Sequence, residues 1–175
     1  MTKKDQVNKR RLMVYPGTFD PFTKGHFSVV ERALLLCDEL HVVAFDNSRK
    51  TSILTRTQRA GLIRKALAHL PEVKVGHSDG LVVDYCLCHE ITLIVRGVHG
   101  PLSFEDELMM ADINRLIGGG IETVFLPSVA QTRSLSSSIV REIARLGGDI
   151  SGMVPDSILS DIERDYGPGP IGYNI

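Results

Sequence analysis

The sequence is poor in cysteine, and its cysteines follow no known metal-binding or disulfide pattern. Cys37, Cys86 and Cys88 are the three cysteines, and no CxxC pair is present. The spacing of Cys86 and Cys88 is not a usual zinc spacing, and three cysteines do not favour a disulfide framework. Cys37 continues an apolar helical pattern, so we expect it to pack as a small hydrophobic side chain. A protein without disulfides is typical of the cytoplasm, so we expect a cytoplasmic location.

A strong net charge and long apolar runs are also missing. The formal net charge is −1, with 43% hydrophobic and 23% charged residues, so no overall field favours nucleic acid or an anionic membrane. No apolar run approaches the roughly 20 residues of a membrane span. The basic start MTKKDQVNKRR is not followed by the apolar segment of a signal peptide. We therefore expect no nucleic-acid and no membrane partner, and we interpret residues 1–11 as a flexible N-terminal extension.

Two common phosphate-binding motifs are absent as well. No GxGxxG follows the first predicted strand, so a dinucleotide fingerprint is not supported. No GxxxxGK[ST] occurs either, which excludes a P-loop. Any phosphate group must therefore be held by other means.

Five short apolar runs predict the strands of a sheet. Apolar and polar residues do not alternate strictly in them, which is typical of strands that are buried on both faces of a parallel sheet. Segments with helical spacing of apolar residues lie between them, so we predict an α/β fold: a Rossmann-like, doubly wound, five-stranded parallel sheet flanked by helices in a single domain. The runs are residues 12–15, 41–45, 73–75, 93–95 and 123–126. The helical spacings begin at Phe27, Ile63, Met109 and Ile139, and a last short helix is predicted over residues 156–165. The predicted domain extends over residues 12–166, and residues 167–175 are predicted to be an irregular tail rich in glycine and proline.

Four loops are predicted to meet at one edge of this sheet. Ligands of such folds bind outside the carboxyl ends of the strands. The segments that follow the first, second, fourth and fifth strands are residues 16–26, 46–50, 96–99 and 127–138, and they carry glycines, hydroxyls and cations. This edge is therefore the candidate phosphate site.

The first of these loops contains a histidine at the start of a helix. Gly25-His26 opens that helix, where unpaired backbone N–H groups and the helix dipole favour an anion. A lone histidine there is more often a capping or solvent-facing residue. The neighbouring Thr18, Thr23 and Gly25 favour instead a hydrogen bond from His26 to phosphate. Asp20, before Pro21, is interpreted as a structural turn residue.

The other loops leave alternatives open. The serines before the helix at Ile139 are good N-caps, and they could also cradle a nucleotide. Arg96, directly after a buried strand, predicts either an anion or a salt bridge to Glu105, Asp106 or Glu107. Glu107 could equally be a helix-dipole partner, and Lys50 lies in a polar loop where most lysines are solvated.

Four stretches carry a resemblance to a known family. YPGTFDPFTKGH, SRKT, VRGVHGPLSFEDE and SLSSSIVRE occur in this order. In order and spacing they resemble the bacterial phosphopantetheine adenylyltransferases, which belong to the nucleotidylyl transferase superfamily with an (H/T)xGH motif. The resemblance extends over residues 12–162. The TxGH motif alone is shared with other cytidylyl and adenylyl transferases, whereas its combination with RGxx, FExE and the serine run is specific.

The resemblance implies a nucleotidylyl transferase domain over residues 12–166 and a reaction. ATP and 4′-phosphopantetheine would give dephospho-coenzyme A and pyrophosphate with Mg2+, the penultimate step of coenzyme A biosynthesis. The acceptor phosphate would attack the α-phosphate in line, without a covalent intermediate. A homohexamer in the cytoplasm and feedback by coenzyme A are also typical of the family.

The resemblance also assigns roles to residues. His26 would stabilise the transition state, and Lys50 and Arg96 would hold the phosphopantetheine phosphate. Thr18 would contact both substrates, and Val82 would line the pantetheine arm. The ATP-binding residues would be Thr18, Phe19, His26, Gly97, Val98, His99, Glu107, Thr132, Arg133, Ser134, Leu135, Ser136, Ser137 and Ser138.

Two positions depart from the family pattern. His99 stands where the family usually has a second arginine, and a mostly neutral imidazole lacks the bidentate fork of arginine. Arg133 stands where the family more often has an aromatic or small residue. We hypothesise that Arg133 or Lys24 supplies the missing charge. The alternatives are a nucleotidylyl transferase that uses CTP or nicotinamide mononucleotide, a nucleotide-binding regulator without turnover, and a nucleic-acid module that uses the basic extension.

Overall fold

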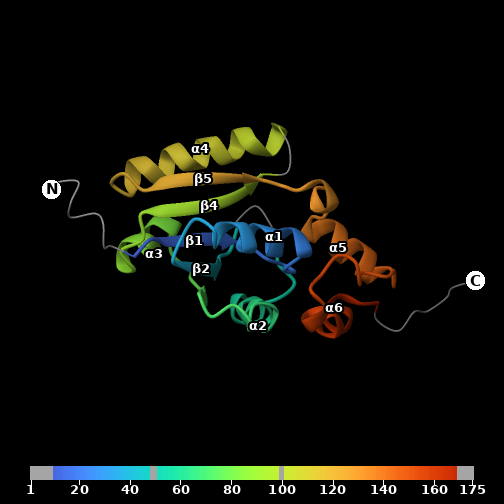
Figure 1. Ribbon diagram of the computed structural model, residues 1–175. Coiled ribbons are helices and arrows are strands. Elements are labelled where there is room, and N and C mark those ends of the chain that lie inside the picture. Colours follow the sequence, from blue (N-terminus) through green and yellow to red (C-terminus); the bar gives the residue numbers. More distant parts are fainter. Residues whose placement is uncertain (1–9, 48–50, 99–100, 169–175) are drawn as a thin grey trace, which may run out of the picture.

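The strands form one parallel sheet, as the sequence predicts. The computed structural model describes residues 10–47, 51–98 and 101–168, and the side chains of 101–103 are not included. Within these residues the strand order is β3-β2-β1-β4-β5, and every pairing is parallel. The first strand is therefore central, and the chain winds outward from it in both directions (Figure 1). The strands are β1 Leu12–Gly17, β2 Glu39–Ala44, β3 Val73–His77, β4 Leu93–Val98 and β5 Glu122–Pro127.

Helices cover both faces of the sheet. One apolar cluster joins Met13 and Tyr15 of β1 to α1 and α2, and a second joins Val14 of the same strand to Val83 and Cys86 of α3. Because neighbouring residues of β1 enter opposite clusters, the strand is buried on both sides. The helices are α1 Lys24–Ala33, α2 Arg56–Ala66, α3 Val82–Cys88, α4 Pro101–Ile117, α5 Ser137–Arg145 and α6 Leu159–Tyr166, with 3-10 turns η1 Ala130–Thr132 and η2 Asp156–Ile158.

Three expectations about the helices need correction. Helix α3 has no counterpart among the predicted helical spacings. Helix α1 ends at Ala33, so Cys37 lies beyond it, although its side chain is buried and its Sγ donates to Ala33 O at 3.3 Å. The last helix is split into η2 and α6. The lysines of the basic extension and most of the Gly/Pro tail lie outside the described residues.

Helix α4 carries its apolar residues on the side away from the sheet. Met109, Ile113 and Leu116 have the predicted helical spacing, but they are 61%, 41% and 82% exposed. The opposite side of α4 packs on the sheet, where the rings of Phe104 and Phe125 lie 5.2 Å apart. Figure 1 shows α4 as an outer layer beside β5. Among the described residues, no helix is both long and apolar enough to cross a membrane.

The central strands separate toward their carboxyl ends. Strands β1 and β2 are in register over six residue pairs, whereas β1 and β4 are paired only at Met13–Leu93 and Val14–Ile94. The chain leaves β1 toward β2 on one side and reaches β4 on the other, which makes this the topological switch point of the sheet. The predicted phosphate loops begin at this opening, and α5 and α6 lie at the same end (Figure 1).

Candidate active site

His26 is held by the capping box of helix α1. Thr23 is the N-cap residue, and its Oγ1 accepts from the His26 backbone N–H at 3.3 Å. The His26 ring in turn accepts from the Thr23 N–H, with 3.0 Å between N and Nδ1. Because Nδ1 is an acceptor in this bond, the proton of the neutral ring lies on Nε2. The capping role and the phosphate role are therefore compatible, since the cap uses Nδ1 and places the donor on Nε2.

Aromatic rings fix the plane of His26. Phe19 lies edge-on to it at 5.0 Å between ring centroids, and Phe22 lies at 5.5 Å. Tyr15 follows at 6.4 Å, and burial raises the pKa of its phenol, an effect that nearby Arg96 opposes. Tyr15 thus stays neutral at physiological pH, and the His26 ring sits against an apolar wall.

Gly17 and Phe19 shape the loop before this helix. Phe19 has φ 51° and is buried. A Cβ at Gly17 would lie 2.7 Å from the Phe19 ring, too close for any other residue without a shift of the ring. Thr18, between them, is half-buried. Asp20 is buried and accepts four hydrogen bonds, which confirms its interpretation as a structural residue.

The serine-rich segment packs against the same corner. A Cβ at Gly25 would lie 3.5 Å from Leu135 O and 3.7 Å from Thr132 O. Ser136 caps α5 by accepting from Ile139 N at 3.2 Å, and Ser137 Oγ donates to Pro21 O at 2.9 Å. The predicted convergence of the two loops is confirmed, and capping explains Ser136.

Arg96 forms the predicted salt bridge, and its partner is Glu107. Its Nε and Nη2 each donate to one Glu107 oxygen at 2.6 Å, and Nη1 donates to Pro16 O at 2.5 Å. The guanidinium therefore spans the opening between β1 and β4. Gly97 follows, and a Cβ there would lie 2.9 Å from Val29 of α1, so glycine permits α1 to pack closely on β4. The Val98 carbonyl accepts from Ser128 N and Oγ.

Other predicted residues are spread around this corner. Val82 begins α3 on the opposite face of the sheet and is half-buried. Arg133 and Ser134 are exposed, and Ser138 is exposed at the start of α5. Lys24 Nζ is engaged with Ser151 O at 3.0 Å and Asp156 Oδ1 at 3.3 Å. Lys50 and His99 lie outside the described residues.

Arg59 is a residue of this region that sequence reasoning missed. It is 0% exposed, although it lies in the polar helix α2. Its guanidinium donates to the carbonyls of Leu54, Thr18 and Phe45 and pairs with Asp46. Its guanidinium therefore links the residues that follow β1 and β2, next to the loop that leads to His26. Neither its spacing nor its neighbours in the sequence distinguish it from a solvated arginine.

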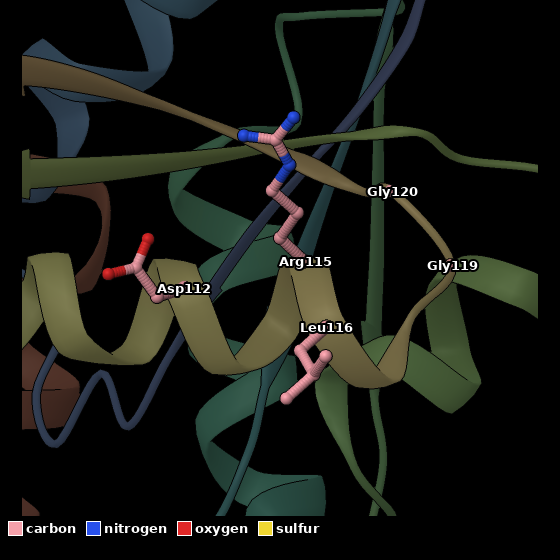
Figure 2. Close-up of a pocket in the computed structure, with 5 residues that line it drawn as sticks. All are labelled: Asp112, Arg115, Leu116, Gly119 and Gly120. Carbon is pink, nitrogen blue, oxygen red and sulfur yellow. The ribbon is translucent and has the colours of Figure 1, made fainter.

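A surface hollow lies away from this corner. It has a volume of about 520 Å³ and is lined by Asp112, Arg115, Leu116, Gly119 and Gly120. Figure 2 shows Arg115 and Leu116 pointing to different sides of α4. The hollow lies where α4 ends and β5 begins, at the amino ends of the strands. The TxGH corner (residues 23–26) lies at the carboxyl ends of the strands, so the hollow lies apart from this candidate site.

The residues that the structure describes offer no ready cage for a metal ion. Among the described residues, no group of three or more His, Cys, Asp or Glu side chains is placed to hold one. The carboxylates of Asp20 and Glu107 are engaged by tyrosine and arginine donors.

Comparisons with known proteins agree with the geometry. A family model described as Cytidylyltransferase-like matches residues 14–143. Proteins named phosphopantetheine adenylyltransferase from Finegoldia magna and Bifidobacterium longum are 39% and 43% identical, over 91% and 85% of this chain and 98% and 90% of their own. A relative of the same name from Synechocystis is 40% identical over 91% of this chain and 99% of its own.

A solved structure supports the fold. It is a candidate nicotinate-nucleotide adenylyltransferase from Vibrio parahaemolyticus, with a TM-score of 0.64 over 89% of this chain and 93% of that one. At 18% identity it bears on the architecture and not on the substrate.

Proposed function

The chain belongs to the cytidylyltransferase-like family and within it to the phosphopantetheine adenylyltransferases, and from this premise we propose that it transfers the adenylyl group of ATP to 4′-phosphopantetheine. The products are dephospho-coenzyme A and pyrophosphate. The observation that carries the proposal is the meeting of the TxGH corner with the serine-rich entry of α5 at the switch point of the sheet. Both segments offer hydroxyls and backbone N–H groups to a triphosphate.

The transfer proceeds in one displacement. A phosphate oxygen of 4′-phosphopantetheine forms a bond to the α-phosphorus of ATP, and the bond to the β-phosphate oxygen breaks. The bonding electrons leave with pyrophosphate, so no side chain has to gain or lose a proton. His26 Nε2–H is aimed at an α-phosphate oxygen, where negative charge grows in the transition state. Positioning and charge stabilisation supply the catalysis.

Arg96 serves the acceptor phosphate. Three of its five N–H groups are used by Glu107 and Pro16. The carboxylate of Glu107 fixes the plane of the guanidinium, and the two remaining N–H groups bind the phosphate. Glu107 thus orients Arg96 in addition to its predicted place in the ATP site. Lys50 is the second cation for this phosphate, and Val82 lies against the pantetheine arm.

ATP binds as its magnesium complex. When bound, Mg2+ would neutralise charge on the phosphates and would be held by phosphate oxygens and water, since no cluster of His, Cys, Asp or Glu among the described residues offers it a cage. The nucleotide-binding residues are those predicted from the sequence, with Thr132–Ser138 along the triphosphate. Feedback by coenzyme A would act at the same acceptor site, and the cytoplasm supplies both substrates.

The protein also associates with copies of itself. Five apolar residues of α4 face away from the sheet, namely Met109, Met110, Ile113, Leu116 and Ile117, and each is at least 41% exposed. A contiguous apolar helix face of this kind marks an interaction surface in a water-soluble chain. Association through α4 is consistent with the homohexamer that the family resemblance implies.

The proposal is tested by the product. Protein is incubated with ATP, magnesium and 4′-phosphopantetheine, and dephospho-coenzyme A is measured by mass spectrometry. We expect product from the wild type and a loss of about 100-fold or more in kcat for His26→Ala, because a transition-state donor is removed. His26→Gln keeps a side chain that suits the capping box, so it should fold normally and also lose activity.

Two controls make the result specific. His69→Ala removes an exposed histidine that stacks on Phe27, and it should retain wild-type kcat. Full activity in His26→Ala would refute the role of the corner. Product with CTP or with nicotinamide mononucleotide, and none with this substrate pair, would establish the alternative nucleotidylyl transferase.

A further inference from the structure

Asp20 is a buried carboxylate whose acceptor sites are all filled. It is 1% exposed. Oδ2 accepts from Ile53 N at 2.9 Å and Arg141 Nη1 at 3.2 Å, and Oδ1 accepts from Tyr166 OH and from Leu54 N at 3.4 Å. A carboxylate has about four acceptor positions, and a buried one is costly to leave without partners.

The donors come from three separate parts of the chain. Ile53 and Leu54 follow β2, Arg141 lies in α5, and Tyr166 ends α6. Arg141 also donates to the backbone carbonyl of Asp20. The three segments are thus fixed to one another through a single side chain of the loop with the sequence TFDP (residues 18–21), called the TFDP loop below.

Tyr166 holds one of the two carboxylate oxygens. Without its hydroxyl, Oδ1 retains only the 3.4 Å contact with Leu54, which is long for a hydrogen bond. The carboxylate would then be held mainly through Oδ2, by Ile53 N and Arg141 Nη1. Tyr166 is itself 4% exposed, so water has little access to replace the hydroxyl.

The loop passes this constraint to His26. Phe19 precedes Asp20, and its ring lies 5.0 Å from the His26 ring at an interplanar angle of 89°. Pro21, which follows Asp20, accepts from Ser137 at the start of α5. A shift of the Asp20 anchor would therefore reach the residues that contact both the His26 imidazole and the serine-rich entry of α5.

We infer that Tyr166 is a positioning residue for the transfer reaction, and that through Asp20 it holds the TFDP loop in register with α5 and residues 53–54. The inference rests on the proposed function for its kinetic consequence. Tyr166 is buried against Asp20, and it acts by keeping His26 where the α-phosphate needs it. A purely structural tyrosine would affect the melting temperature and leave the folded enzyme equally fast.

The test is Tyr166→Phe, which removes one oxygen atom and keeps the ring. We expect kcat to fall about tenfold, because a small misplacement of a catalytic group is costly, while KM for either substrate stays within twofold. Amide hydrogen exchange, measured by mass spectrometry, should become at least threefold faster at Ile53 and Leu54. Arg141→Lys, which cannot reproduce the planar fork, should show the same split between kcat and KM.

Tyr85→Phe is the matched control. It also removes a tyrosine hydroxyl, one that bonds His41 Nδ1 at 2.9 Å on the opposite face of the sheet. Wild-type kcat and unchanged exchange in Tyr166→Phe would overturn the inference, as would equal effects in Tyr85→Phe. If the wild type makes no dephospho-coenzyme A, the proposed function fails. The exchange rates then decide alone: faster exchange in Tyr166→Phe sustains the coupling, and unchanged exchange refutes it.

Discussion

Arg133 and Lys24 differ in their freedom to meet a triphosphate. Lys24 is engaged by the Ser151 carbonyl and by Asp156, which ties the residue to the segment before α6. Arg133 is exposed between η1 and α5, and among the described residues it has no hydrogen-bond or ion-pair partner. Of the two candidates for the missing cation, the structure therefore favours Arg133.

Replacement of Arg133 by alanine should weaken ATP binding. We expect Arg133→Ala to raise KM for ATP about fivefold, because an exposed charge contributes about 1 kcal/mol, and to leave KM for 4′-phosphopantetheine unchanged. Steady-state kinetics with each substrate varied in turn measures both. Arg145→Ala, which removes an exposed arginine of α5 paired with Glu142, is the control. Equal KM values for ATP in Arg133→Ala and the wild type would exclude the charge hypothesis.

Single residues of the site were predictable where the signal is local. The capping pattern of Thr23 and His26 lies within four residues, so the sequence indicates both the helix start and the ring. Arg96 and Glu107 are eleven residues apart, and the salt bridge was one of two predicted alternatives. Arg59 and Tyr166 depend on partners up to 146 residues away, and no local pattern encodes such a contact.

At the scale of elements, the predicted strands are confirmed, because each is a short apolar run between more polar or turn-forming segments. Helix α3 was missed because Val82–Cys88 is only seven residues long and its N-cap, Leu81, makes no side-chain cap. So short a helix is stabilised by tertiary packing rather than by propensity, here through Val83 and Cys86 on the sheet.

Helices α2 and α6 are joined by a charge pair that predicts a pH dependence. Lys65 Nζ lies 2.7 Å from Asp161 Oδ2, and this bond, with help from Arg164, lowers the pKa of Asp161 below its usual 3.8. A lowered pKa contributes stability that is present above about 3.8 and is lost as the pH falls through the lower folded value. The pair therefore stabilises the fold at neutral pH and not in strong acid.

Asp161→Asn should reveal this difference. We expect its melting temperature to lie about 1–3 °C below that of the wild type at pH 7, and the two to converge at about pH 2. Circular dichroism on heating, at both pH values, measures it. Glu163→Gln alters a neighbouring exposed carboxylate, and its difference in melting temperature from the wild type should be the same at both pH values. A constant difference at both pH values would contradict the assignment.

At the scale of the whole molecule, the outward face of α4 is an apolar surface that a single chain leaves exposed to water. Its apolar residues follow the spacing i, i+4, i+7 and i+8 from Met109, so they form a single stripe. The sequence predicted the periodicity correctly. It could not say whether the stripe faces its own sheet or another chain, because both give the same pattern.

A charge on this stripe should weaken the proposed self-association. Leu116 is 82% exposed, so Leu116→Lys should leave the fold of one chain intact and weaken self-association at least tenfold. Analytical ultracentrifugation over a range of concentrations measures the oligomeric state. Leu35→Lys, at an 81% exposed leucine after α1, is the matched control and should assemble like the wild type. A wild type that stays monomeric at micromolar concentration would disprove association through α4.

The bond between Asp20 and Tyr166 also has a consequence for the order of synthesis. The two residues are 146 positions apart, so the TFDP loop leaves the ribosome long before the helix that completes it. At about 5–20 residues per second, that interval lasts on the order of ten seconds. Until α6 emerges, the carboxylate of Asp20 keeps water as a partner, and the loop cannot close around it. The first corner of the enzyme to be translated is thus among the last to reach its working geometry.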